Sequence, residues 1–297
     1  MVNDLDEAYA ACERVARAHY ENFPVASLLL PRYLRRHVVA VYAFARAADD
    51  FADEGSLSAG ERHALLDGWL DRLRHASRSS TRGPAPRPGE PAHAPQVFHA
   101  LGVTIREKGL SLSLFEDLLS AFRQDVAVTR YETWDDIFDY SRRSANPVGR
   151  LVLRIAGHDD PGMDRWSDAL CTALQLTNFW QDLAADFTRG RIYVPQQEVR
   201  AHAAAEQDLA LPIASQAWKG VVAGAVARTR ELFAAGRPLC DVLHGRLQLE
   251  LRATWLGGMR VLNRIEEAEF DVVRRRPRLG AADLPWLAWR LAVWTPG

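Results

Sequence analysis

Two pairs of aspartates, each with a four-residue spacing, are the part of this sequence best suited to chemistry. The second pair lies in the stretch QLTNFWQDLAADFTRGRIYVP, residues 175–195, which places polar groups in an otherwise apolar helical pattern. With ~3.6 residues per helical turn, Gln175, Asn178, Asp182 and Asp186 share one face. The flanking residues are apolar: Leu174, Leu176, Phe179, Trp180 and Leu183. An unpaired carboxylate is costly beside apolar packing, so this face predicts a bound cation, and Mg2+ suits such oxygen ligands.

The first pair lies in a similar helical stretch, VVAVYAFARAADDFADEG, which starts at Val38. Asp49 and Asp53 share one face of that helix, with Asp50 and Glu54 beside them. Four carboxylates within two turns repel one another and also meet the unfavourable end of the helix dipole. Two such helices facing each other across a cavity would hold several Mg2+ ions, with a diphosphate as the natural ligand.

The four-residue spacing alone also has a simpler explanation. It recurs at Asp67/Asp71, Asp135/Asp139, Asp160/Asp164 and Asp164/Asp168. For any single pair, a solvated acidic face with local ion pairs is the alternative. Arg46 precedes Asp49 by one turn, and Arg189 and Arg191 follow Asp186. We expect these arginines to contact phosphate oxygens, with ion pairing to the carboxylates as the alternative.

Composition and charge exclude several classes of protein. The 297 residues are 48% hydrophobic, which is ample for the core of a globular protein, and the net charge of -1 predicts no nucleic-acid partner. The three cysteines are too few and too scattered for a disulfide framework or a zinc site. The N-terminal residues lack the apolar core of a signal peptide, and no apolar run approaches the ~18 residues of a membrane span. We therefore expect a cytoplasmic protein.

The periodic apolar positions predict an all-α chain without a convincing strand. Ser58 with Glu61 predicts a capping box at the start of one helix. Five prolines between residues 84 and 95 predict a disordered or extended loop at about 76–95. Since the helical texture resumes unchanged after that loop, we expect a single domain over residues 1–297. The helices are expected over 5–20, 32–54, 59–75, 95–108, 112–126, 134–155 with a break at SANPVG, 164–188, 212–235 and 237–262.

The C-terminal segment LPWLAWRLAVWTP is rich in tryptophan. Trp286, Trp289 and Trp294 with Arg290 suit peripheral contact with a membrane surface, at the inner face for a cytoplasmic protein. Packing on the protein's own helices is the alternative.

Several motifs together resemble one known family. They are Leu29-Leu30-Pro31, the helix from Tyr42 to Glu54, Pro147-Val148-Gly149, and Gln175 to Pro195. In this order and spacing they resemble the squalene/phytoene synthase family over essentially the whole chain. The resemblance implies an isoprenoid synthase fold, a helical bundle around a central apolar cavity, and chemistry on prenyl diphosphates with two or three Mg2+ ions. It supports Asp49, Asp53, Asp182 and Asp186, with Asn178, as metal ligands.

The sequence departs from the common family pattern in the second aspartate helix, where Gln181 stands for a usual Arg and Ala185 for a usual Glu; Ala45 stands for a frequent Cys. Phrases such as HYENFPVASLLLP and SANPVGRLVL resemble the bacterial members that convert presqualene diphosphate into hydroxysqualene without NADPH. An enzyme that starts from presqualene diphosphate holds one diphosphate, whereas a condensing enzyme holds two. It therefore needs fewer cationic contacts, which is compatible with Gln in place of Arg at position 181. The alternatives are condensation of two farnesyl diphosphates, or of prenyl diphosphates into phytoene, and a non-catalytic assembly factor. Other squalene-pathway enzymes are the expected partners.

Aromatic residues at motif positions are expected to surround the carbocation that remains after diphosphate leaves. The candidates are Phe23, Tyr42, Phe51, Tyr140, Phe179 and Tyr193. A ring that faces the charge contributes roughly 0.5–2 kcal/mol of cation–π stabilisation. For each of them, ordinary core packing is the alternative. Tyr42 and Tyr140 resemble cavity positions of the family, and Gln175 and Asn178 are expected to position water or the intermediate.

Overall fold

The regular structure of this chain is helical. The computed structural model describes residues 2–18, 30–53, 55–79, 81 and 83–295, and within them β pairing is limited to an isolated bridge between Arg130 and Ile192. The all-α prediction is thereby confirmed. Internal contacts divide the chain into two compact units, residues 1–127 with 147–160, and residues 128–146 with 161–297. The single domain expected over 1–297 stays a prediction.

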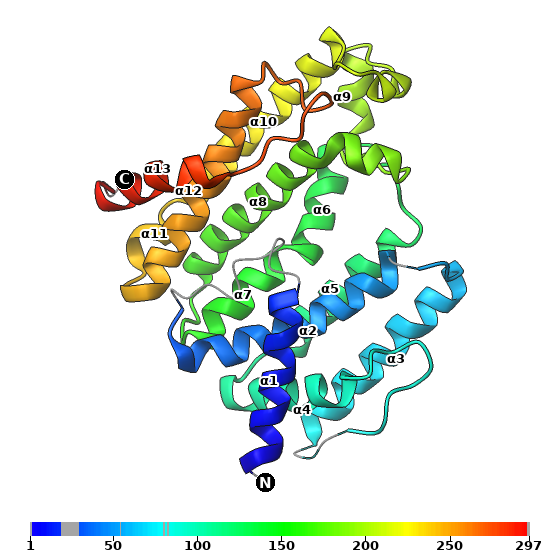
Figure 1. Cartoon of the computed structure of the whole chain (residues 1–297), viewed down its shortest axis with the longest axis vertical. Helices are drawn as coiled ribbons and strands as arrows, with labels where there is room; N and C mark the ends of the chain where they lie inside the picture. Colours follow the sequence, from blue (N-terminus) through cyan, green and yellow to red (C-terminus); the bar gives the residue numbers. More distant parts are fainter. Residues whose placement is uncertain (1, 19–29, 54, 80, 82, 296–297) are drawn as a thin grey trace. The chain divides into compact units, whose positions relative to one another are not determined.

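The first unit is built around α2, which contacts four other helices (Figure 1). Its helices are α1 Val2–Ala18, α2 Arg32–Asp53, α3 Ala59–Arg78, α4 Ala94–Lys108, α5 Leu112–Asp125 and most of α7 Asn146–Ile155. Phe44 of α2 lies in an aromatic core, 5.5 Å from Phe115 and 6.0 Å from Phe98 between ring centroids. Trp69 of α3 packs in the same core, and its indole N–H donates to the Phe44 carbonyl over 3.1 Å. Burial of these rings fixes where the acidic end of α2 lies.

The second unit is built around α8, which packs most extensively on α10 (Figure 1). A buried hydrogen bond from Trp180 Nε1 to Thr229 Oγ1, 2.8 Å long, ties the two helices together. Gly236 permits their close approach, since a Cβ there would lie 2.8 Å from the Leu170 backbone nitrogen. The helices are α6 Trp134–Ser144, α8 Pro161–Thr188, α9 Gln196–Ala201, α10 Gln216–Gly236, α11 Leu239–Val242, α12 Gly245–Glu267 and α13 Leu284–Ala292, with 3-10 turns at Glu206–Ala210 and Ala281–Asp283.

Several predicted helix ends differ from the structure by a few residues, and two helices differ more. The predicted helix 237–262 is wrong as one element: α11 ends at Val242, and α12 begins at Gly245, which has a φ of +65° that breaks the helix. The helix predicted from Pro212 begins at Gln216 instead, because the Ser215 side chain caps it by accepting from Trp218 N. The predicted break in 134–155 and the capping box at Ser58 are both confirmed.

The described part of the proline-rich loop is held by a buried ion pair. Arg72 of α3 pairs with Glu90 at 2.7 Å, and both side chains are buried. Arg72 also donates to the carbonyl oxygens of Pro84 and Ala85, over 3.0 and 2.5 Å. Residues 76–78 of the predicted loop belong to α3 and residues 94–95 to α4. The disordered or extended loop at about 76–95 stays a prediction, and the buried arginine was not anticipated.

Candidate active site

The polar stripe of α8 lies on one face of that helix, as predicted. Gln175, Asp182 and Asp186 are half-buried and Asn178 is exposed, and the apolar neighbours are almost all buried. The side chains of Asp182 and Asp186 keep only 18% and 15% of their surface exposed. Two carboxylates with this little water around them require positive charge nearby.

A glycine follows the end of α8, four residues after the second aspartate. Gly190 has a φ of +82°, and its N–H donates to the Phe187 carbonyl over 2.9 Å. The N–H of Arg191 donates to the Asp186 carbonyl over 2.9 Å. These two hydrogen bonds form a Schellman motif, which places Asp186 in the last turn of the helix. The helix dipole disfavours a carboxylate there, so a bound cation would stabilise it.

Asp182 binds an arginine from the C-terminal part of the chain. Arg276 Nη2 donates to Asp182 Oδ2 over 2.8 Å, and its Nε lies against Oδ1. Asn178 donates to the same carboxylate over 3.1 Å. Arg189, which is mostly exposed, lies 4.0 Å from Asp186. Arg276 was missed at the sequence level, where the only signal was the basic run of residues 274–278.

Gln181, the departure from the family pattern, also contacts the C-terminal segment. Its Nε2 donates to the Pro277 carbonyl over 2.5 Å. The amide therefore holds the backbone next to Arg276. That a site for one diphosphate needs fewer cationic contacts, and therefore tolerates Gln at position 181, stays a prediction.

The acidic end of α2 has its arginine on the same helix. Arg46 Nη1 donates to Asp49 Oδ2 over 3.1 Å, and Nη2 contacts Asp50. Asp53 is exposed in the last turn. Arg62 of α3 covers the end of the helix by donating to the Phe51 carbonyl over 2.9 Å. Local ion pairing, the simpler alternative, is thus present at Asp49 and Asp50. Contact between Arg46 and phosphate stays a prediction.

Tyr42 lies one turn before Arg46 on α2 and is half-buried. Burial raises the pKa of its phenol, and Arg46 partly opposes that shift. The hydroxyl therefore stays protonated at neutral pH and is able to donate a hydrogen bond.

The aromatic candidates of the second unit form one cluster. Phe179 stacks on Tyr193 at 3.8 Å with an interplanar angle of 4°. Tyr140 lies 5.9 Å from Tyr193 and 6.1 Å from Phe179. Tyr131, which was not predicted, joins the cluster at 5.5 Å from Tyr140. All four rings are buried, and Phe179 follows Asn178 of the polar stripe directly.

One aromatic candidate, Phe51, lies in a different core. Phe51 packs edge-on against Trp69, 5.2 Å away, in the core of the first unit, which is the ordinary core packing given as its alternative. Phe23 and Glu54 lie outside the described residues.

Comparison with known proteins decides the family. The family model described as squalene/phytoene synthase matches residues 16–283. The chain belongs to the squalene/phytoene synthase family. The family comprises enzymes that act on prenyl diphosphates and use a divalent metal.

Relatives and solved structures narrow the similarity within the squalene/phytoene synthase family. The chain is 37% identical to the hydroxysqualene synthase of Rhodopseudomonas palustris, over 78% of this chain and 74% of that protein. It is 38% identical to the hydroxysqualene synthase of Zymomonas mobilis, over 76% of this chain and 72% of that protein. The crystal structure of squalene synthase HpnC from Alicyclobacillus acidocaldarius matches with a TM-score of 0.79 and 38% identity, covering 90% of this chain and 96% of that one.

The oxygen donors of this family member fit a divalent cation. Among the residues that the structure describes, no three His, Cys, Asp or Glu side chains come together as a ready metal cluster. Each unit nevertheless offers a carboxylate pair on one helix face, and an arginine already meets a carboxylate at each. Carboxylate and amide oxygens that attract a guanidinium are also the hard ligands that Mg2+ prefers.

Over the described part of the chain, no helix combines the length and the apolar character needed to cross a membrane.

Proposed function

We propose that this chain is a hydroxysqualene synthase, which converts presqualene diphosphate and water into hydroxysqualene and diphosphate. The observation that carries the proposal is the 37–38% identity to two hydroxysqualene synthases over about three quarters of the chain. Intact aspartate pairs on α2 and α8 support it, since an assembly factor without catalysis has no need of them.

The proposed reaction breaks one C–O bond and forms another. Diphosphate leaves with the bonding electron pair, and the cyclopropylcarbinyl cation that remains rearranges by opening its ring. A water oxygen then bonds to the cation and loses a proton. No electrons enter or leave overall, so NADPH is not required.

In this proposal Asp49 and Asp53 of α2, with Asp182, Asp186 and Asn178 of α8, hold two or three Mg2+ ions. The bound metal supplies Lewis acidity that stabilises the departing diphosphate. The side chains position the charge: two unit charges at about 4 Å interact by roughly 4 kcal/mol at an effective dielectric of 20. Ligand positions on two helices suit a ligand that carries several charges.

Arginines and polar groups near the aspartates bind the remaining phosphate oxygens. Arg46 lies beside Asp49, Arg189 follows Asp186 by three residues, and Arg191 follows it by five. Guanidinium groups suit phosphate because they donate two parallel hydrogen bonds. Gln175, one turn before Asn178, positions the substrate or the attacking water.

The aromatic cluster supplies the apolar wall that the cation needs. Tyr140, Phe179 and Tyr193 are buried and in mutual contact, which excludes water from their vicinity. Tyr131 supports this wall by packing on Tyr140 and Tyr193. On α2, the protonated Tyr42 contributes a ring and a hydroxyl donor. Phe23 stays a sequence prediction for the same wall.

The test is product analysis by mass spectrometry. Wild-type protein incubated with presqualene diphosphate and Mg2+, without NADPH, is expected to form hydroxysqualene, and Asp182→Asn is expected to form almost none. Folded protein that leaves presqualene diphosphate unchanged but makes it from farnesyl diphosphate contradicts the proposal and establishes the condensing reaction instead.

We also propose that α13 contacts an anionic membrane surface, which suits a lipid substrate. Leu284 and Trp289 of α13 keep 63% and 57% of their surface exposed, and Val293, which follows the helix, is also exposed. Arg290 lies among these apolar residues, and the basic run of residues 274–278 precedes them. Exposed apolar side chains beside arginines are the pattern of an interfacial helix. The inner-face localisation and the contact with other squalene-pathway enzymes stay predictions.

Vesicle sedimentation tests this membrane contact. Wild-type protein is expected to sediment with vesicles of anionic lipid, and Trp289→Ser with Leu284→Ser to stay in the supernatant. Tyr33→Ser is the control, because Tyr33 is equally exposed but lies on α2. Equal sedimentation of all three proteins contradicts the contact.

A further inference from the structure

A segment of largely irregular backbone, residues 271–283, connects α12 to α13, and we call it the strap. Its first residue, Asp271, is held in place by hydrogen bonds to two backbone N–H groups. Asp271 is buried, and its Oδ1 accepts hydrogen bonds from the backbone N–H of Ala214 over 3.0 Å and of Arg274 over 3.1 Å. The start of the strap is therefore held by the side chain of its own first residue.

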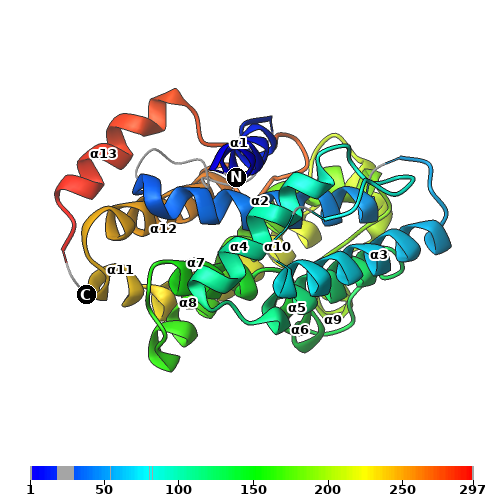
Figure 2. The ribbon, with the colours of Figure 1, turned by 90° about the horizontal axis from the view of Figure 1, so that it is seen from below.

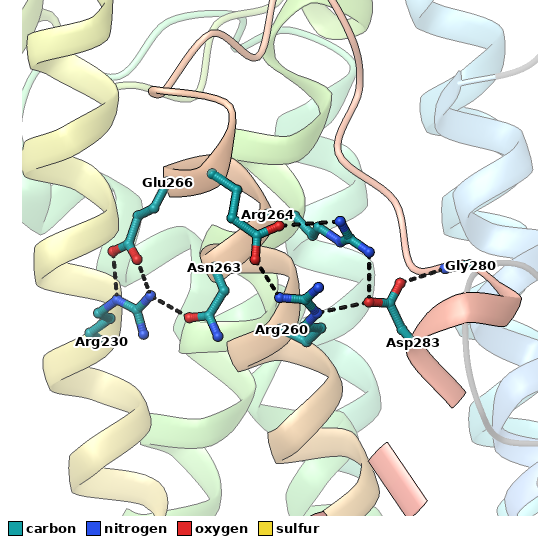
Figure 3. A network of polar contacts seen from close by, with 8 residues as sticks. Arg230, Arg260, Asn263, Arg264, Glu266, Gly280 and Asp283 are labelled. Carbon is teal, nitrogen blue, oxygen red and sulfur yellow. Dashed lines mark hydrogen bonds and ion pairs between the residues drawn. The ribbon is translucent and has the colours of Figure 1, made fainter. Parts of the chain in front are cut away.

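The last residue of the strap is fixed to α12. Asp283 is 2% exposed and accepts from Arg260 Nε over 2.7 Å and Arg264 Nη2 over 2.9 Å (Figure 3). Its second oxygen accepts from the Gly280 N–H over 2.9 Å. The Gly280 N–H and the Arg260 guanidinium lower the pKa of Asp283 to about 2, so this anchor stays charged at any physiological pH. Figure 2 shows α13, which follows this anchor, beside α12.

Between its anchors the strap contacts α8 at the polar stripe. Arg276 binds both oxygens of Asp182, and the Pro277 carbonyl accepts from Gln181. The neighbouring strap residues Arg275 and Arg278 are exposed. Arg276 is thus the member of the basic run that the strap directs onto a proposed metal ligand.

A guanidinium and a metal ion cannot use the same carboxylate lone pairs at the same time. We propose that Arg276 competes with the metal for Asp182, so that the strap covers Asp182 when the site is empty and leaves it when metal and diphosphate bind. This inference rests on the proposed function, because it takes Asp182 as a metal ligand. The fixed ends confine the movement to the middle of the strap, and Arg276 returns to Asp182 when product departs.

Metal binding provides the first test. The probe is Mn2+ with inorganic diphosphate, titrated into the full chain by calorimetry. Arg276→Gln removes the competitor and is expected to tighten Mn2+ binding by about three- to tenfold, the scale of a partly buried ion pair. Arg275→Gln removes the same charge one residue away and is the matched control, with little change expected. Equal or weaker Mn2+ binding by Arg276→Gln overturns the competition.

Trypsin cleavage provides a second test that does not depend on activity. The bonds after Arg275 and Arg278 lie in the strap. Cleavage there is expected to be slow in the metal-free wild type, and several-fold faster with Mn2+ and diphosphate or in Gln181→Ala. Unchanged cleavage, or protection by Mn2+ and diphosphate, overturns the release of the strap.

Two variants distinguish a failure of the metal-site assignment at Asp182 from a failure of the proposed competition by Arg276. If Asp182→Asn abolishes Mn2+ binding while Arg276→Gln leaves it unaltered, the competition is wrong and the metal site stands. If Asp182→Asn leaves Mn2+ binding intact, the assignment of Asp182 as a ligand is itself wrong.

Discussion

The acidic ends of α2 and α8 both carry aspartates that repel one another, but the arginines that offset this repulsion come from different parts of the chain. Each carries aspartates four residues apart near the end of its helix, and each has an arginine bound to a carboxylate. On α2 the arginine is Arg46, three residues from Asp49, so the pair forms whenever the helix does. On α8 the arginine bound to Asp182 is Arg276, 94 residues away along the chain, so this pair depends on the strap, while Arg189 lies 4.0 Å from Asp186. The arginine that binds Asp49 is therefore built into α2, whereas the one that binds Asp182 can be withdrawn.

Removing one aspartate from each helix gives the largest expected effect. Asp53→Asn and Asp182→Asn are each expected to lower kcat on presqualene diphosphate by about 10²- to 10³-fold, because each removes charge that stabilises the departing diphosphate. Asp71→Asn is the control, since Asp71 has the same spacing to Asp67 on α3 and is exposed. A large loss in one variant with near wild-type rates in the other contradicts a joint role.

Acid is expected to weaken the first unit before the second. Burial lowers the pKa of His37 on α2 from 6.5 to about 4, and its Nδ1 lies 2.9 Å from Thr104 Oγ1. The unfolded chain therefore binds a proton first, so this contribution is full above pH 6.5 and falls as the pH drops from 6.5 through 4. The loss is about 3 kcal/mol at most.

Thermal unfolding between pH 7 and pH 4 checks this expectation. His37→Gln keeps a polar group near Thr104 but does not titrate, so its Tm is expected to fall less with acid than that of the wild type. Parallel pH profiles for the two proteins contradict the role of His37. The contribution of Asp283 in the second unit is lost mainly between pH 3.8 and its pKa of about 2, so it changes little above pH 4.

The two arginines are expected to respond differently to substitution. Arg46→Gln leaves Asp49 and Asp50 close together without their partner and is expected to cost about 1 kcal/mol of unfolding free energy, and to raise KM about tenfold. Arg276→Gln also removes an ion pair and is expected to cost a similar amount of unfolding free energy, roughly 0.7–1.4 kcal/mol, but not to raise KM, because Arg276 leaves Asp182 when the substrate binds. Chemical denaturation and steady-state kinetics of both variants check this expectation, and a tenfold rise in KM for Arg276→Gln contradicts the distinction between local and distant partners.

The end of α8 is expected to depend on one glycine. Gly190→Ala places a side chain at a φ of +82° and is expected to cost about 1 kcal/mol of unfolding free energy. Gly224→Ala on α10 is the matched control, since no atom lies within 4 Å of the added Cβ and an alanine in a helix is expected to stabilise by up to about 1 kcal/mol. Denaturation midpoints that move in the same direction for both variants contradict this account.

Local patterns predicted much of this architecture. The helical periods gave the all-α class, and the capping box at Ser58 and the polar stripe on α8 lie where the spacing placed them. Features that join distant parts of the chain could not be predicted. Nothing in the run of residues 274–278 indicates which arginine meets Asp182, because the fixed ends of the strap decide that. The buried ion pair between Arg72 and Glu90 could not be predicted either, because the two residues are distant along the chain.

The site was predicted unevenly. Tyr140, Phe179 and Tyr193 come together in the structure as members of one cluster, whereas Tyr131 carried no motif that would have marked it. Phe51 shares its helix with Asp49 but packs into the core, since a motif position does not determine which way a ring points. That the two aspartate pairs serve one diphosphate stays a prediction.

Counting the Mn2+ ions bound per chain in the presence of inorganic diphosphate, by electron paramagnetic resonance, tests that central claim most directly. The wild type is expected to bind two or three ions only when diphosphate is present. Replacing either pair by asparagine, at Asp49 and Asp53 or at Asp182 and Asp186, is expected to abolish this diphosphate-dependent binding in folded protein. Undiminished binding after the loss of either pair would contradict the account.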